Sequence, residues 1–167
     1  SYSNLGVCFN DKGKNKTALI FFQKSMEIRV KTLGPDHPDL GSSYNNIGIT
    51  YKSLGEYDKS IEFFQKALEI RKKVLGLEHP EISRLYNNIG VIYASKGKYD
   101  KALEIYKKAL NIRLISLGPE HLEVGRLYNN IGNSYDEKGE YDKSIEFTQK
   151  ALYILRKTLG PNHPDVG

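Results

Sequence analysis

The five residues Tyr44-Asn45-Asn46-Ile47-Gly48 decide how this chain is organised, because they recur at one fixed spacing. The same five letters return at residues 86–90 and again at 128–132, and a degenerate copy occupies residues 2–6. Each copy begins 42 residues after the one before it. A constant period of this size is typical of repeat proteins, in which one supersecondary unit is stacked against the next.

A second motif, Leu33-Gly34-Pro35-Asp36-His37-Pro38, follows the same step and returns in altered form at 75–80, 117–122 and 159–164. The two motifs together predict one domain made of four units. The units cover about residues 1–37, 38–79, 80–121 and 122–163, and residues 164–167 would start a further unit. Since the chain has no initiator Met and opens inside an expected helix, we expect it to be a fragment of a longer protein.

Each unit is expected to form two helices, as residues 38–79 illustrate. Pro38 suits the first position of a helix, where no N–H partner is needed, and Gly55 is expected to end that helix. A second helix is predicted from about Tyr57 to Leu75, because its apolar residues recur at steps of three and four. One such hairpin cannot bury its apolar stripe alone. Stacking the hairpins buries it, which predicts a solenoid with an extended concave surface.

This pattern resembles the tetratricopeptide repeat in the 42-residue form found in kinesin light chains. The resemblance rests on the family's alternation of small and large packing residues, matched in the second unit by Ile47, Gly48, Tyr51, Ser60, Phe64 and Ala67. It implies an all-α fold, a right-handed superhelical solenoid of stacked antiparallel helix pairs. It also implies a non-catalytic scaffold for protein–protein interaction that holds an extended, acidic peptide in the concave groove.

In the family, the asparagine before the Ile-Gly pair often points into the groove. The matching positions are Asn4, Asn46, Asn88 and Asn130. An amide offers both donors and an acceptor, so this ladder would pair with a peptide backbone. The same asparagines could instead bond between neighbouring helices, since buried amides need partners. The sequence leaves both roles open.

One turn earlier lie Arg84 and Arg126, whose guanidinium groups would bind acidic side chains, although they could equally be solvated surface charges. One turn later lie Ile49, Val91 and Asn133, which would form a mostly apolar shelf. The expected partner is therefore an acidic protein segment or peptide, consistent with a net charge of +5.

Residues that could support other chemistry are better explained by structure. The histidines occur once per unit, at 37, 79, 121 and 163, and stacked helices would keep them too far apart to share a metal ion. We expect them to have a role in the loops or as helix caps, and we predict no metal, cofactor or catalytic site. The single cysteine, Cys8, is expected to be a packed small residue, and one cysteine fits a reducing, cytoplasmic location.

Two alternative functions remain open at this stage. The apolar faces at both ends of the repeat array favour a structural protein that self-associates end to end. A sequence pI of about 9.1 would suit an RNA-binding helical repeat, but most lysines are spaced to pair with acidic residues, which makes nucleic acid a weaker candidate. No apolar run is long enough to predict a membrane span.

Overall fold

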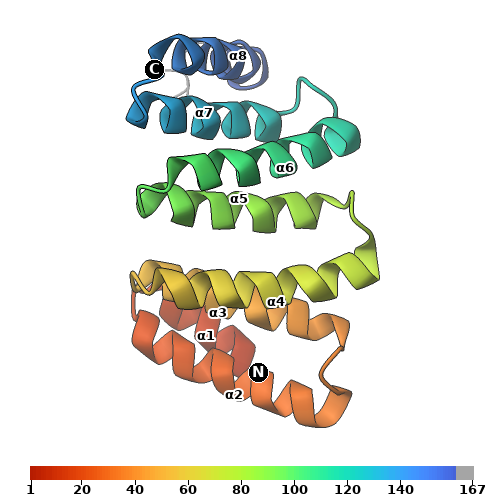
Figure 1. Ribbon diagram of the computed structural model, residues 1–167. Coiled ribbons are helices and arrows are strands. Elements are labelled where there is room, and N and C mark those ends of the chain that lie inside the picture. The colour runs from red at the N-terminus through yellow and green to blue at the C-terminus, as the bar shows by residue number, and fades with distance from the viewer. Residues whose placement is uncertain (161–167) are drawn as a thin grey trace. The chain divides into compact units, whose positions relative to one another are not determined.

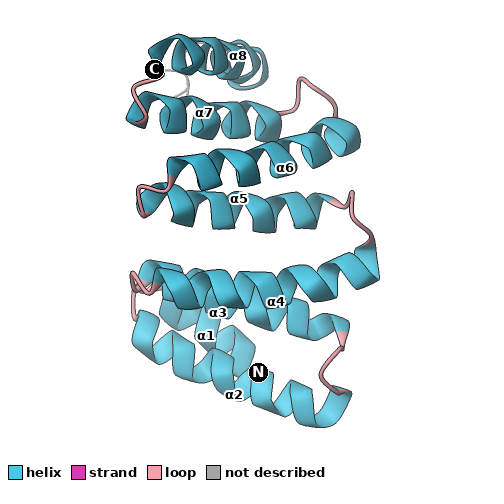
Figure 2. Cartoon of the chain, viewed as in Figure 1, coloured by secondary structure: helices cyan, strands magenta, loops and turns pink. Residues whose placement is uncertain are grey.

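The computed structural model describes residues 1–160, and all regular structure among them is helical (Figure 2). The helices are α1 (Tyr2–Asp11), α2 (Asn15–Leu33), α3 (Pro38–Ser53), α4 (Tyr57–Leu75), α5 (Pro80–Ser95), α6 (Tyr99–Leu117), α7 (Leu122–Glu137) and α8 (Tyr141–Leu159). The predicted all-α fold of helix pairs is therefore confirmed. The expected start of a further unit at 164–167, and His163 before it, lie outside the described residues.

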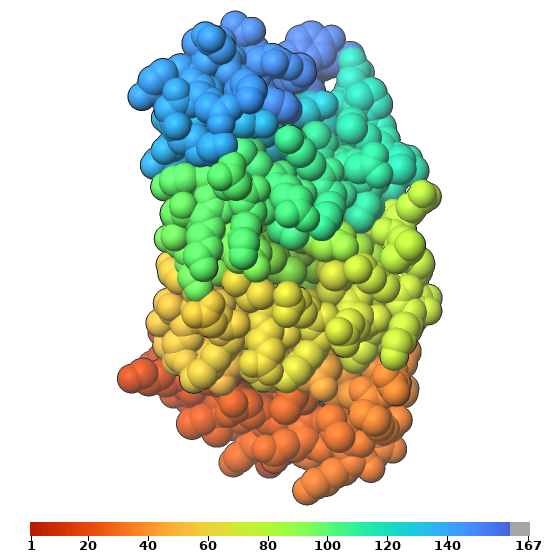
Figure 3. Space-filling view, in the orientation of Figure 1, coloured from red at the N-terminus to blue at the C-terminus, as the bar shows by residue number. Residues whose placement is uncertain are grey.

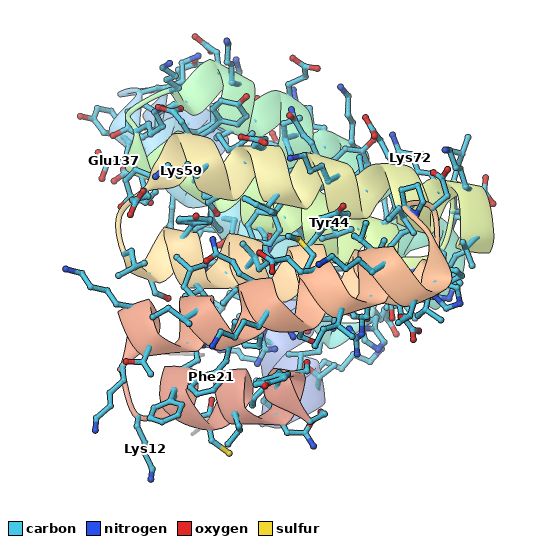
Figure 4. The ribbon with its side chains drawn as sticks, turned by 90° about the horizontal axis from the view of Figure 1, so that it is seen from below. Lys12, Phe21, Tyr44, Lys59, Lys72 and Glu137 are labelled. Atoms are coloured by element: carbon cyan, nitrogen blue, oxygen red, sulfur yellow. The ribbon has the colours of Figure 1, made fainter. Side chains whose placement is uncertain are left out.

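The helices separate into two compact units. Unit 1 is Ser1–Gly76 and contains α1 to α4, and unit 2 begins at Leu77 and contains α5 to α8 (Figure 1). In unit 1, α2 packs against both α1 and α3. The ring of Phe21 lies between α2 and α1 (Figure 4) and stacks on the ring of Phe9, with 5.2 Å between centroids.

In unit 2, short turns join α5 to α6 and α7 to α8 at one end, and a longer loop joins α6 to α7 at the other (Figure 1). Successive helices of the unit are therefore antiparallel. The core lies between α6 and α7, where Leu103 and Tyr106 meet Ile131 and Tyr135. Side chains fill the space that the ribbon view leaves between these helices (Figure 3).

Close packing within each hairpin depends on one glycine of the first helix. A Cβ on Gly48 would lie 2.9 Å from the ring of Phe64, and a Cβ on Gly90 would lie 2.5 Å from the ring of Tyr106. Real Cβ atoms do not approach so closely, so only glycine fits. The small and large packing positions predicted from the repeat therefore meet in space.

Histidine side chains begin three of the helices. The Nδ1 atoms of His37, His79 and His121 accept hydrogen bonds from backbone N–H groups two residues later, at 3.1–3.2 Å. These bonds satisfy donors that a helix start leaves without intrahelical partners. The capping role expected for these three histidines is confirmed. Among residues 1–160, no cluster of three or more His, Cys, Asp or Glu side chains is arranged to hold a metal ion.

The expectation that Cys8 is packed was wrong, because Cys8 is exposed. Its repeat equivalents Thr50, Ile92 and Ser134 are buried. Thr50 lies on α3, against which α2 of the preceding hairpin packs, and Ser134 lies on α7, against which α6 packs, whereas α1 packs mainly against α2. Burial at this position therefore depends on the neighbouring repeat and not on the helix itself.

None of the helices described combines the length and apolarity needed to cross a lipid bilayer.

Candidate functional site

Two adjoining pockets lie along the surface that α5 and α7 share in unit 2. The first, the arginine pocket, has a volume of about 390 Å³. Its lining is Ser83, Arg84, Asn87, Arg113, Glu123, Arg126, Leu127, Asn129, Asn130 and Leu155. The second, the tyrosine pocket, has a volume of about 260 Å³. Its lining is Val91, Ala94, Ser95, Tyr99, Tyr106, Asn130, Asn133, Ser134 and Glu137.

The arginine pocket is positively charged, because three guanidinium groups face one carboxylate. Arg84 comes from α5, Arg126 from α7, and Arg113 from the second helix of the hairpin, α6. The Glu123 carboxylate accepts a hydrogen bond from Arg126 Nη1 at 3.1 Å through Oε1, and its Oε2 lies 3.8 Å from Arg113 Nη2. The side chains that line the pocket therefore carry two more positive charges than negative ones.

Arg113 is the buried member of this set, with 9% of its surface exposed. Burial lowers the pKa of its guanidinium, the Glu123 carboxylate raises that pKa, and the Arg84 charge lowers it again. Arginine nevertheless stays protonated in proteins, so the charge persists at the floor of the pocket. An anion entering the pocket would meet this charge away from bulk water, where electrostatic attraction is stronger.

Three asparagines supply neutral donors and acceptors beside these charges. Asn130 Nδ2 donates a hydrogen bond to Asn87 Oδ1 at 2.9 Å, which ties α7 to α5. This bond uses one amide donor of Asn130 and leaves its Oδ1 and its second N–H for other partners. In unit 2, then, an asparagine of the predicted ladder bonds between helices and also lines both pockets.

The tyrosine pocket is less charged. The Tyr99 hydroxyl donates a hydrogen bond to Glu137 (labelled in Figure 4) at 3.1 Å, which joins α6 to α7 across it. Glu137 and this bond raise the pKa of Tyr99. Tyr106 lies at the buried base, where desolvation raises its pKa well above the ordinary value, so the phenol remains neutral. The pocket thus has an aromatic and small-residue lining with one acidic side chain at its edge.

The structure brings together five of the residues singled out in the sequence. Arg84, Arg126 and Asn130 line the arginine pocket, and Val91, Asn130 and Asn133 line the tyrosine pocket.

The remaining predicted residues line neither pocket. Asn88 is half-buried on α5, Asn46 and Ile49 are half-buried on α3 of unit 1, and Asn4 is exposed on α1.

Sequence reasoning missed Arg113 and Glu123, which shape the charge of the arginine pocket. Arg113 belongs to a 42-residue series with Arg29 and Arg71 on the second helices of their hairpins. That recurrence was a usable signal, because arginine repeated beside the apolar stripe of a helix is unusual. Glu123 also recurs, as Asp39 and Glu81, in the first turn of the first helices.

Comparison with known proteins agrees with this architecture. The tetratricopeptide repeat family matches three overlapping stretches, residues 1–73, 44–115 and 81–152. The chain therefore belongs to the tetratricopeptide repeat family, as the resemblance predicted. Comparison with curated proteins found no match.

Solved structures share the fold. BtubC (BKLC) from P. vanneervenii is 23% identical with a TM-score of 0.86, over 98% of this chain and 65% of that one. A kinesin light chain-like protein of Podosopora anserina with nearly identical TPR-like repeats is 22% identical with a TM-score of 0.82, over 99% and 78%. RapI in its apo form is 20% identical with a TM-score of 0.86, over 99% and 57%. The chain thus spans less than two thirds of the BtubC and RapI structures, and these likenesses concern the fold alone.

Proposed function

We propose that this chain is a non-catalytic interaction scaffold whose unit 2 binds an extended acidic segment of a partner protein along α5 and α7. The observation that carries this proposal is the arginine pocket, where Arg84, Arg113 and Arg126 face the single carboxylate of Glu123. Tetratricopeptide repeats generally bind protein partners, which agrees with this role.

The two pockets together suit a short extended ligand. Along α7, Arg126 and Asn133 are two turns apart, which corresponds to about 10 Å along the helix. An extended peptide covers that distance in about three residues. An acidic side chain would enter the arginine pocket, and an uncharged side chain about three residues away would reach the tyrosine pocket. Asn130 lies between them and would bond the peptide backbone.

Fluorescence polarisation with labelled acidic peptides tests the proposal. Glutamate-rich nine-residue peptides should bind, and lysine-rich peptides of the same length should not. Arg84→Ala should weaken binding roughly tenfold, because it removes charge-assisted hydrogen bonds. Arg156→Ala is the matched control, since it removes an exposed arginine of α8 outside both pockets.

If no acidic peptide binds, the proposal fails. If Arg84→Ala and Arg156→Ala weaken binding equally, only net charge attracts the ligand and the pocket has no role in recognition.

End-to-end self-association is a second candidate, favoured by one contrast in exposure. Ile145 on α8 is 56% exposed, whereas its repeat equivalent Leu103 is 5% exposed in the core between α6 and α7. On α1, Leu5 is exposed, whereas its equivalent Ile131 is buried in that core. The α8 face of one copy would therefore receive α1 of another, in a head-to-tail arrangement.

Sedimentation velocity tests this self-association. The mass should rise with concentration, and Ile145→Glu should abolish the rise. A mass independent of concentration would rule out self-association.

Three further expectations belong with this proposal. The four repeats would form one domain, the protein would act in the cytoplasm, and it would catalyse no reaction. RNA binding remains the weaker alternative. It would be favoured only if labelled RNA bound more tightly than the acidic peptides and lost affinity steeply with salt.

A further inference from the structure

The arginine of the second helix has different partners in the two units. In unit 1, Arg29 Nη1 donates hydrogen bonds to Ser43 Oγ at 2.7 Å and to the Asp39 carbonyl at 3.3 Å. Arg71 Nη2 donates to Ser42 Oγ at 2.6 Å. Serine hydroxyls of α3 therefore serve both arginines, which gives them a structural role within the unit.

Arg113 of unit 2 lacks these acceptors. Arg84 occupies the repeat position of Ser42, and Leu127 occupies that of Ser43. Among the described residues, no hydrogen bond joins the Arg113 side chain to another residue, and its contact with Glu123 is 3.8 Å long. The Arg113 guanidinium therefore presents N–H donors that no side chain accepts, and none of its nitrogen atoms is sealed from solvent.

The replacement of Ser42 by Arg84 also adds a like charge. With Arg84 in place of Ser42 and Leu127 in place of Ser43, the arginine of the second helix no longer donates to serine hydroxyls of its own unit. It can then bind an external anion. Arg126 adds a third guanidinium on the opposite wall, partly neutralised by Glu123. The pocket therefore combines guanidinium donors, a lining with two more positive than negative side chains, and about 390 Å³ of space.

From this arrangement we infer that the arginine pocket binds a phosphate monoester, the side chain of a phosphoserine or phosphothreonine in the partner. A phosphate ester carries a charge of roughly −1.5 to −2 near pH 7 and three acceptor oxygens, which matches the net charge and the converging donors. A single carboxylate would compensate one charge only. Guanidinium groups pair with phosphate through two parallel hydrogen bonds, so three of them can surround one phosphate. This inference rests on the proposed peptide-binding role of unit 2.

Three fluorescein-labelled peptide libraries test the inference. Each has degenerate flanks around one fixed central residue, which is phosphoserine, glutamate or serine. At constant ionic strength, the phosphoserine library should bind roughly tenfold more tightly than the glutamate library, because the ester adds charge-assisted bonds. Equal binding of these two would overturn the phosphate inference and leave the acidic-peptide proposal standing. If neither bound, both would fail.

Arg113→Leu identifies the residue responsible. Leucine occupies the same repeat position on α8, as Leu155, so the repeat accommodates it. The variant should reduce the ratio of phosphoserine to glutamate affinity to about one, with circular dichroism unchanged. Arg71→Leu is the matched control at the same position in unit 1 and should keep the ratio of the parent protein. A ratio that survives Arg113→Leu would overturn the assignment.

A second variant keeps the test decisive if Arg113→Leu does not fold. Arg84→Ser changes an exposed residue and restores the hydroxyl that Arg71 uses in unit 1. Arg113 would then donate to this serine, and the preference for phosphoserine should fall severalfold. An unchanged preference in a folded Arg84→Ser protein would contradict the inference.

Discussion

Units 1 and 2 consist of the same 42-residue repeat, but the arginine of the second helix has different partners in each. In unit 1, Arg29 and Arg71 donate to serine hydroxyls of α3 at 2.7 and 2.6 Å. In unit 2, Arg113 meets Arg84 and Leu127 at the corresponding positions and lies at the floor of a charged pocket. Apart from the shorter α1, the helices of the two units begin and end at equivalent residues, so two side chains are enough to change the role of a third. The repeat determines where the helices lie, and residue differences between its copies form the candidate site.

The largest expected difference between the units concerns the glycine of the hairpin. An alanine at Gly90 would place its Cβ 2.5 Å from Tyr106, whereas an alanine at Gly48 would lie 2.9 Å from Phe64. Both rings are buried and cannot withdraw freely. We expect Gly90→Ala to lower the free energy of unfolding by about 2 kcal/mol and Gly48→Ala by about 1 kcal/mol, after the gain in helix propensity. Urea denaturation measures both, and equal or reversed costs would contradict this account of hairpin packing.

Helix caps provide the next contrast. His37 precedes Pro38, whose ring favours the start of α3, whereas His121 precedes Leu122. Substituting either histidine with alanine removes a capping acceptor and should cost about 1 kcal/mol, with the larger loss at His121. His37→Asn and His121→Asn are the controls, because an asparagine side chain can still cap the helix. Thermal unfolding would disprove the role of Pro38 if His37→Ala were the more destabilising change.

Arg84→Ser should convert the environment of Arg113 toward that of Arg71. Removing a like charge and supplying an acceptor should raise the stability of the free protein by about 1 kcal/mol. The same change should weaken the binding of acidic peptides, which separates stability from function at this position. A chemical denaturation curve measures the first effect, and a less stable Arg84→Ser protein would show that the Arg113 donors gain nothing from an acceptor at position 84.

The smallest expected effect involves an exposed group of ion pairs around Lys138 of unit 2. Lys138 Nζ lies 2.6 Å from Asp100 Oδ1 and 2.6 Å from Glu140 Oε1, whereas Leu54 occupies its position in the second hairpin of unit 1. Hydrogen bonds from Lys138 and Lys143 lower the pKa of Glu140 from 4.5 to about 2. Because the folded pKa is depressed, this contribution to stability is present above about pH 4.5 and is lost as the pH falls toward 2.

NMR titration of the carboxyl groups in Lys138→Met tests whether Lys138 lowers the pKa of Glu140. The pKa of Glu140 should rise toward its ordinary value, while Lys143 still provides one hydrogen bond at 2.6 Å. Since these groups are exposed, the change in overall stability should be slight and should shrink further in high salt. An unchanged pKa of Glu140 would show that Lys138 does not bind this carboxylate in solution.

The repeat, the helices and the family could all be predicted from the amino-acid sequence. These depend on local causes: proline and histidine at helix starts, glycine at helix ends, and apolar residues at helical spacing. The contact between Gly90 and Tyr106 was also predictable, because it joins two helices of one hairpin at fixed positions.

Only the tertiary structure decided which polar residues meet. Asn130 bonds Asn87 of another hairpin, and Arg113 enters a pocket formed mainly by α5 and α7. Asn88 carries the same motif as Asn130 yet lines neither pocket, and Cys8 is exposed where its equivalents are buried. The physical reason is that burial and hydrogen bonding depend on the neighbouring helices, whereas helix formation depends on the residues of the helix itself.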